Sequence, residues 1–138
     1  MLKTVNVDLP GRAYEVRIGT GLIANAGHQI SPLLKRPKVA VITDETVASL
    51  HLDALRDGLG LAGIEMEALA LPAGEGTKSW GPLERSVDWL LDQKVERGDI
   101  VIAFGGGVIG DLAGFAAAIL RRGVRFVQIP TSLLAQVD

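Results

Sequence analysis

The sequence predicts an α/β fold, a Rossmann-like parallel sheet flanked by helices and preceded by an N-terminal β-hairpin. After the hairpin the pattern runs helix, then strand and helix three times, then strand. Alternation of this kind is typical of a parallel sheet that is covered on both faces. The run DIVIAF supports this fold, because an uninterrupted apolar run is typical of a strand buried on both sides.

The first half of the chain carries the hairpin and two strand–helix repeats. Pro10-Gly11 is a turn pair between two runs that alternate, or nearly alternate, between polar and apolar residues. The helix that follows the first apolar strand is expected to hold Leu50, Leu55 and Leu59 on one side. The expected elements are strands at 4–9 and 14–18, a helix at 21–34, a strand at 38–43, a helix at 47–61 and a strand at 64–71.

The second half continues the alternation. Residues 72–78 read as a loop, and Ser79 can cap the next helix. Pro130 is expected to close the last strand, because proline has no N–H for a sheet ladder. The expected elements are a helix from about 80 to 93, a strand at 99–104, a glycine loop at 105–110, a helix at 111–120 and a strand at 124–129.

Length and composition favour one domain, residues 1–138, with an apolar fraction of 48%. The net charge of −2 argues against a nucleic-acid-binding face, and the absence of cysteine excludes disulfides and thiolate metal sites. His28 and His51 lie in separate segments, so each is better explained as an exposed helix residue than as a zinc ligand. The start resembles no signal peptide, and the apolar run at 112–120 is too short to cross a membrane, so a soluble cytoplasmic protein is expected. The apolar ending SLLAQVD suggests a piece of a longer polypeptide.

The most informative segment is FGGGVIGD, residues 104–111. Gly105, Gly107 and Gly110 match the pattern G-x-G-x-x-G between a buried strand and a helix. A helix start presents unpaired N–H groups and the positive end of the helix dipole, which attract phosphate. Two alternatives stay open: the glycines can simply allow tight packing, and Asp111 can be an N-cap or first-turn acid.

Polar residues also follow the other predicted strands, where ligands bind in open α/β sheets. An acid at such a place can accept from ribose hydroxyls, and a lysine or hydroxyl can bind phosphate or sugar. The alternatives are helix caps at 44 or 46 and solvated loop charges at 75 and 78. A basic cluster of Arg121, Arg122 and Arg125 can recognise phosphate or complement a helix C-terminus. The candidates are Asp44 and Thr46, Glu75 and Lys78, and Thr131 and Ser132.

Three segments together resemble the 3-dehydroquinate synthases, a family of sugar phosphate cyclases. GGGVIGDLAGFAAAILRRGVRFVQIPTSLLAQVD, at 105–138, is very similar to that family's signature. PAGEGTKS, at 72–79, is similar to its PxGExxKS loop, and TDETVA, at 43–48, to its first nucleotide-contact segment.

The resemblance implies a two-domain enzyme, a lyase of the shikimate pathway that serves chorismate and aromatic amino acid biosynthesis. Such enzymes hold NAD between the domains and convert 3-deoxy-D-arabino-heptulosonate 7-phosphate to 3-dehydroquinate with loss of phosphate. NAD is a recycled oxidant, and a divalent zinc or cobalt ion polarises the reacting oxygen. A homodimer and a sugar phosphate substrate are the partners that the resemblance implies.

The resemblance also assigns roles by position. It places Asp44 at the adenosine ribose of NAD, with Thr46 in the same nucleotide-contact segment, and Glu75 and Lys78 near the ribose and amide of the nicotinamide side. Thr131 and Ser132 are expected to contact the nucleotide, Asp138 to be a substrate-side acid, and Arg122 to reach the neighbouring subunit's substrate phosphate. The residues expected along or beside the pyrophosphate are Gly106, Gly107, Val108 and Asp111.

Departures from the family pattern are mild within the chain. Thr46 stands where Asn is common, and Ser132 where Thr is common, and both keep a hydrogen-bonding side chain. The family's metal ligands, a Glu and two His, belong to its helical C-terminal domain and lie beyond residue 138. We therefore assign no metal ligand and expect no turnover from these 138 residues alone.

Other functions remain as alternatives at this point. Another sugar phosphate cyclase, or an iron- or zinc-dependent alcohol or glycerol dehydrogenase, shares the nucleotide-binding arrangement and a GGG-containing loop. The continuation GDLAGFAAA favours the cyclase. A non-enzymatic alternative is a module that only binds nucleotide or oligomerises.

Overall fold

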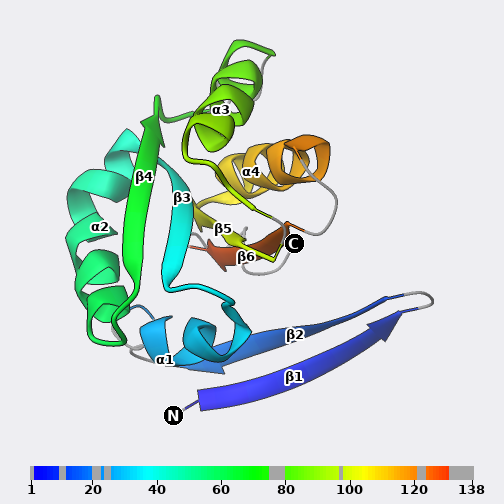
Figure 1. The fold of residues 1–138 in the computed structure, drawn as a ribbon. Coiled ribbons are helices and arrows are strands. Elements are labelled where there is room, and N and C mark those ends of the chain that lie inside the picture. The colour runs from blue at the N-terminus through cyan, green and yellow to red at the C-terminus, as the bar shows by residue number, and fades with distance from the viewer. Residues whose placement is uncertain are drawn as a thin grey trace.

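The computed structural model describes residues 2–9, 12–19, 23, 26–74, 80–96, 98–120 and 124–130, the first two ranges as backbone alone. Figure 1 shows how the elements are arranged. The elements in chain order are β1 (Leu2–Leu9), β2 (Arg12–Gly19), α1 (Ala26–Ile30), the 3₁₀ turn η1 (Ser31–Leu33), β3 (Lys38–Asp44), α2 (Glu45–Gly60), β4 (Glu65–Leu71), α3 (Trp80–Asp92), β5 (Ile100–Gly105), α4 (Gly107–Leu120) and β6 (Arg125–Pro130).

The hairpin predicted at the N-terminus is confirmed. β1 and β2 pair antiparallel in a two-stranded sheet of their own, and the last pair is Leu9 with Arg12. Both strands extend further than the alternating pattern predicts. Pro10 and Gly11 lie outside the described residues.

The main sheet has four parallel strands in the order β4-β3-β5-β6. The chain therefore moves outward from β3 to β4 and then crosses to β5 on the other side of β3. Strand order reverses between β3 and β5, and in open α/β sheets the crevice at such a reversal is where ligands bind. β3 and β5 are the two central strands, and every residue of β5 is buried.

Helices cover both faces of this sheet, as the alternation predicts (Figure 1). Alternate residues of each central strand belong to different apolar clusters, because successive side chains point to opposite faces. Val41 and Ile102 join the cluster with α1 and α2, whereas Ile42 and Ala103 join the cluster with α3 and α4. The fold is thus an open α/β sheet with one helical layer packed on each face.

Two helix boundaries differ from the sequence prediction. The helix expected at 21–34 is short, because α1 ends at Ile30 and Pro32 follows in a 3₁₀ turn, where proline cannot continue an α-helix. α4 begins at Gly107 rather than at Asp111, since the glycines take helical backbone angles instead of forming a loop.

The apolar face of α2 also differs in one residue. Leu55 and Leu59 are fully buried, but Leu50 is 67% exposed and points away from the sheet. Leu50 is five residues from Leu55, which is nearly half a turn out of phase in an α-helix. The prediction that all three leucines share one side was therefore wrong for Leu50.

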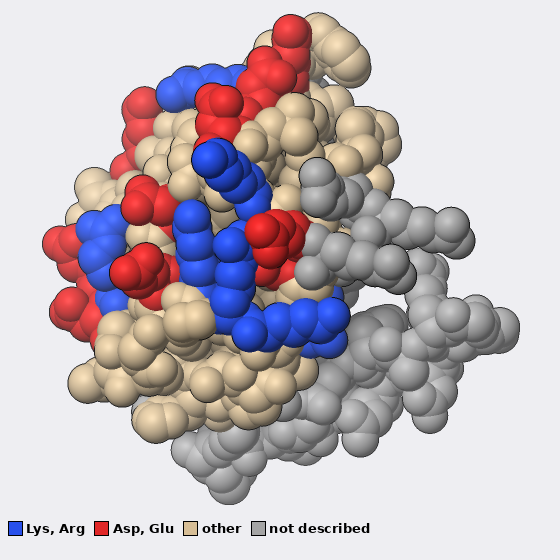
Figure 2. Space-filling model, in the orientation of Figure 1, with Lys and Arg blue, Asp and Glu red and all other residues tan. Residues whose placement is uncertain are grey.

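No helix in the described part of the chain is both long and apolar enough to span a membrane. Figure 2 shows acidic and basic side chains close together on one face of the molecule, with lysine and arginine gathered near its middle.

Candidate functional site at the carboxyl ends of β3 and β5

The two central strands are joined at their carboxyl ends by a buried threonine. Thr43 pairs with Phe104 in the sheet register, and its Oγ1 donates a 2.6 Å hydrogen bond to the carbonyl of Phe104. Asp44 and Gly105 are the next residues on each strand. Since adjacent strands lie about 4.8 Å apart, these two backbones run side by side at the reversal of strand order.

Asp44 caps helix α2. Its Oδ1 accepts a 2.8 Å hydrogen bond from the N–H of Val47, and its extended backbone is that of an N-cap residue. The capping alternative is therefore confirmed for Asp44, and Thr46 is not the cap. Thr46 is exposed in the first turn of α2, where only its carbonyl makes a described contact, with the hydroxyl of Ser49. Contact of either residue with a nucleotide stays a prediction.

The glycine segment forms an open helix start directly after β5. The carbonyl of Gly106 accepts from the N–H of Gly110 at 3.0 Å, so Gly106 is the N-cap of α4 and Gly107, Val108 and Ile109 form the first turn. The first N–H groups of an α-helix have no partner within it. Gly106 has no side chain to cap them, and it is half-buried together with Gly107 and Val108.

Asp111 is not at the helix start. It is the fifth residue of α4 and is exposed, so both explanations of it as an N-cap or first-turn acid were wrong. The reason is the earlier start of α4 at Gly107. A position close to a bound cofactor stays a prediction for Asp111.

The packing explanation fits Gly105, where a Cβ would lie 3.1 Å from the Cβ of Ile109. A Cβ on Gly110 would meet only the terminal amide of Gln128 from β6, which is exposed and can move aside. Neither glycine is among the described glycines with positive φ, so backbone conformation does not demand glycine at these positions. Gly106 and Gly107 differ because they are partly accessible at the helix start.

Several predicted site residues lie outside the described residues. The strands that precede them end at the same edge of the sheet, since all four strands are parallel. Gly74, the last described residue of the loop after β4, is exposed and has a φ of 106°. The undescribed candidates are Glu75, Lys78, Arg122, Thr131, Ser132 and Asp138.

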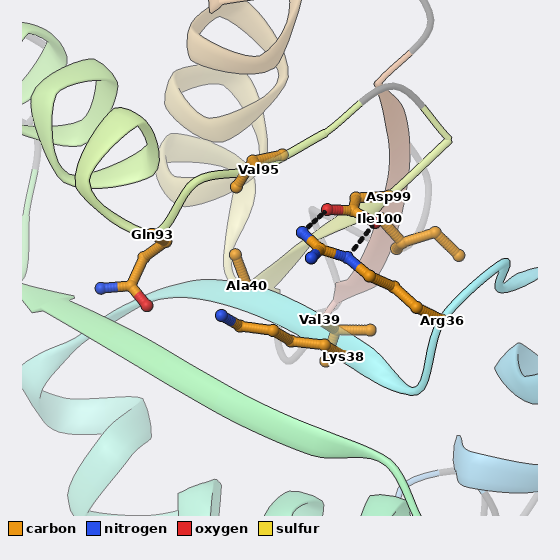
Figure 3. A pocket seen from close by; sticks show the side chains of 8 residues that line it. All are labelled: Arg36, Lys38, Val39, Ala40, Gln93, Val95, Asp99 and Ile100. Carbon is orange, nitrogen blue, oxygen red and sulfur yellow. Dashed lines mark hydrogen bonds and ion pairs between the residues drawn. The ribbon is translucent and has the colours of Figure 1, made fainter.

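A second polar cluster lies at the opposite, amino-terminal edge of the sheet (Figure 3). Arg36 donates from Nε to Asp99 Oδ1 at 3.0 Å and from one terminal nitrogen to Oδ2 at 2.5 Å, and the N–H of Glu96 donates to Oδ2 at 2.8 Å. Burial alone would raise the pKa of Asp99, but the hydrogen bonds from Arg36 and Glu96 outweigh it and hold that pKa below its usual value. The cluster ties the start of β5 to the segment before β3.

Two cavities in the described part of the protein are unsuited to a nucleotide. The cavity beside Arg36 and Asp99 has a volume of about 10 Å³, which is about the space that one water molecule needs. A larger open hollow of about 460 Å³ lies along α3, but Glu84, Asp88 and Asp92 line it and outnumber Arg85, so it would repel phosphate. Neither hollow touches the carboxyl ends of β3 and β5.

Arg125 belongs to the amino-terminal edge. Its guanidinium donates to the carbonyl of Leu33 at 2.6 Å, so this arginine fastens β6 to η1. Of the predicted basic cluster, Arg125 therefore has a structural role, whereas Arg121 and Arg122 are outside the described residues. His28 and His51 are both exposed on helices, as expected. Among the described residues no three His, Cys, Asp or Glu side chains come together as metal ligands would.

The site also contains one residue that no sequence pattern singles out. Thr43 is completely buried, and its hydroxyl fixes the two central strand ends to each other. The only signal in the sequence is a polar residue at the end of the apolar run VAVI, residues 39–42.

The fold and the place of this site define the class of protein, an open Rossmann-like α/β domain in which a helix with a glycine N-cap begins at the strand reversal. The family follows from sequence comparison. The model of the 3-dehydroquinate synthase N-terminal region matches residues 68–138, just over half of the chain, and the chain belongs to the 3-dehydroquinate synthase family. The 3-dehydroquinate synthase of Roseobacter denitrificans is 80% identical over all 138 residues, and the chain spans 37% of the length of that relative.

Solved structures of related cyclases have the same fold. A 2-deoxy-scyllo-inosose synthase complexed with carbaglucose-6-phosphate, NAD⁺ and Co²⁺ superposes with a TM-score of 0.84 at 22% identity, covering 96% of this chain and 36% of its own. The 2-epi-5-epi-valiolone synthase of Streptomyces hygroscopicus subsp. jinggangensis 5008, with NAD⁺ and Zn²⁺ bound, has a TM-score of 0.78 at 30% identity and covers 91% and 34%.

Proposed function

We propose that this chain binds NAD at the carboxyl ends of β3 and β5 and forms the nucleotide-binding part of a 3-dehydroquinate synthase. The observation that carries the proposal is the start of α4, where Gly106 at the N-cap has no side chain to occupy the N–H groups of Gly107 and Val108. A diphosphate has the charge and the acceptor oxygens that these donors and the helix dipole favour.

The described residues fit a dinucleotide at this place. The glycines leave the backbone accessible, and Asp44 stands at the end of the neighbouring strand, where an acid can accept from ribose hydroxyls. NAD supplies a hydride acceptor when it is bound. The residues of this chain orient it: Thr43 locks the two strand ends, Asp44 is held by α2, and α4 directs its first N–H groups toward the phosphates.

The activity proposed for the whole enzyme is conversion of 3-deoxy-D-arabino-heptulosonate 7-phosphate to 3-dehydroquinate with phosphate release. The names of relatives that are at least 70% identical over the whole chain support this activity over an alcohol or glycerol dehydrogenase. The described residues do not fit a zinc or cobalt site, so we derive no metal-dependent step and propose that these 138 residues alone have no turnover. The pathway, a cytoplasmic location and a homodimeric state belong to the same proposal.

The test is NAD binding measured by calorimetry on the wild-type chain and on Gly106→Asp. An aspartate at the N-cap would cap α4 and keep the helix stable, but its carboxylate would take up the first N–H groups and repel phosphate. We expect wild-type protein to bind NAD and the variant to bind at least about tenfold more weakly, with an unchanged or raised melting temperature.

Gly60→Ala is the matched control, because a Cβ there has no neighbour within 4 Å and Gly60 lies at the far end of α2. Its NAD affinity should equal that of the wild type. Unaltered affinity in folded Gly106→Asp would overturn the placement of the phosphates. No heat of binding from folded wild-type chain would overturn the function itself.

A further inference from the structure

Thr43 is a polar residue at a position where packing alone would favour an apolar one. It is completely buried near the end of β3. Because successive side chains of a strand point to opposite faces, Thr43 points to the same face as Val41, which packs in the apolar cluster with α1 and α2. Valine has almost the same shape as threonine and would fill this position without a hydroxyl that must be hydrogen-bonded. The hydroxyl therefore contributes something other than packing.

This hydroxyl holds one particular peptide group. Thr43 Oγ1 donates to the carbonyl of Phe104 at 2.6 Å. Because a peptide group is planar, fixing this carbonyl also fixes the orientation of the N–H of Gly105 in the same group. Gly105 is the first of three consecutive glycines, and the next residue, Gly106, is the N-cap of α4. The threonine hydrogen bond thus lies immediately before the glycine segment that leads into α4.

The glycine segment is held at both ends. Glycine has the widest backbone freedom of all residues, so a run of three must be held by its neighbours to keep one direction. At the far end, the carbonyl of Gly106 accepts from the N–H of Gly110 at 3.0 Å. At the near end, Gly105 pairs on the β6 side with Pro130, which has no N–H to donate to β5. Thr43 adds a donor from β3 at the end of β5 where β6 offers one fewer.

We propose that Thr43 is a positioning residue of the nucleotide site. Its hydroxyl sets the direction in which the glycine segment enters α4, and thereby the aim of the N–H groups of Gly107 and Val108. A hydrogen bond weakens steeply as its angle departs from linearity, so a small rotation of these donors weakens their contact with a diphosphate. Thr43 is completely buried and acts only through this backbone. The inference rests on the proposed function, because it concerns the diphosphate of the nucleotide bound there.

The experiment separates the hydroxyl of Thr43 from its methyl group. Thr43→Val keeps the volume and removes the hydroxyl, whereas Thr43→Ser keeps the hydroxyl and removes a buried methyl group. We expect the NAD⁺ affinity, measured by calorimetry on folded protein, to fall at least about fivefold in Thr43→Val and to stay within about twofold of the wild type in Thr43→Ser. The melting temperature of Thr43→Ser should nevertheless fall, since it loses buried apolar volume. A purely structural role would instead make the affinity follow the stability in both variants.

ADP-ribose locates the effect, because it carries the same diphosphate without the nicotinamide. Its affinity should fall by a similar factor in Thr43→Val, and a loss confined to NAD⁺ would contradict an effect on the diphosphate. If Thr43→Val folds poorly, Thr43→Cys takes its place, because a thiol is a weak donor in a side chain shaped like serine. Thr43→Cys should bind NAD⁺ at least about threefold more weakly than Thr43→Ser, and equal affinities would overturn the inference.

Ser86→Ala is the matched control. Ser86 is also buried, and its hydroxyl donates to the backbone carbonyl of Pro82 at 2.8 Å, but within α3. Its NAD⁺ affinity should stay within about twofold of the wild type. Unchanged affinity in folded Thr43→Val, or an equal loss in Thr43→Ser, would overturn the role of the hydroxyl while leaving NAD binding intact. Failure of wild-type protein to bind NAD⁺ would instead overturn the proposed function.

Discussion

At the scale of single residues, Asp99 forms an ion pair with Arg36 through two hydrogen bonds. Its side chain is 9% exposed and accepts from Arg36 and from the N–H of Glu96. The hydrogen bond to Asp99 also raises the pKa of Arg36. This pair holds the amino ends of β3 and β5 in register, far from the proposed nucleotide site.

Replacing Asp99 by alanine should lower the free energy of unfolding by about 2 kcal/mol at pH 7, because it leaves polar groups unpaired. The folded pKa of Asp99 is lowered, so its stabilising contribution is present above the unfolded pKa of about 3.9 and is lost as the pH falls through the folded value. The difference between wild type and variant should therefore shrink below about pH 4.

Urea unfolding at pH 7 and at pH 3 measures both effects. Asp53→Ala is a suitable control, since Asp53 is exposed on α2 and no described hydrogen bond involves its side chain. A stability difference between wild type and Asp99→Ala that grows toward acid pH would contradict a lowered pKa of Asp99 in the folded protein.

Gly27 is required for the contact between α1 and α2. A Cβ at this position would lie 2.6 Å from the carbonyl oxygen of Gly58 and 2.7 Å from the Cβ of Ala62. Gly27→Ala should therefore push the helices apart and lower the free energy of unfolding by about 1–3 kcal/mol. Chemical unfolding measures this, with Gly60→Ala as the unhindered comparison, and equal midpoints for the two variants would refute the packing argument.

For helices and strands, the sequence predicts the type of each element more accurately than the residues at which it begins and ends. Each predicted strand and helix exists, because apolar spacing reports burial directly. The sequence pattern puts the start of α4 too late, because three consecutive glycines are typical of a loop. In the structure Gly106 is the N-cap and Gly107 is the first residue of the helix. The end of α1 was misplaced because the apolar spacing continues past Pro32, which stops the helix.

The two edge strands of the sheet differ in character. β4 carries Glu65 and Glu67 as exposed charges, which discourage pairing with another strand. β6 has no charge after Arg125, and its Phe126 is 39% exposed. α4 beside it exposes Phe115 and Ile119 on its outer stripe, so this side of the molecule is apolar on both strand and helix.

At the scale of the whole molecule, the strand order could not be predicted from the sequence. The glycine segment comes late in the chain, after the third strand of the parallel sheet, where a dinucleotide fingerprint is unusual. The crossing from β4 back to β5 brings it beside β3, so Asp44 and Gly105 become neighbours although they are far apart in sequence. Only the three-dimensional arrangement unites them.

The proposed homodimer is consistent with the apolar side formed by α4 and β6. Placing a charge there with Ile119→Glu should weaken self-association of the chain at least about tenfold. Leu50→Glu is the matched control, because Leu50 is 67% exposed on α2, on the other face of the sheet. Analytical ultracentrifugation over a range of protein concentrations measures this self-association. Equal association of the two variants, or a wild type that stays monomeric at every concentration, would contradict a dimer interface on α4 and β6.

Binding of NAD at the start of α4 can be observed residue by residue by NMR of the ¹⁵N-labelled chain while NAD is added. We expect the largest, saturable shifts of backbone amides at Gly107 and Val108, with smaller shifts near Asp44 and none around Arg36 and Asp99. Shifts centred on the hollow along α3, or saturable binding that leaves the start of α4 unperturbed, would show that the phosphates bind elsewhere.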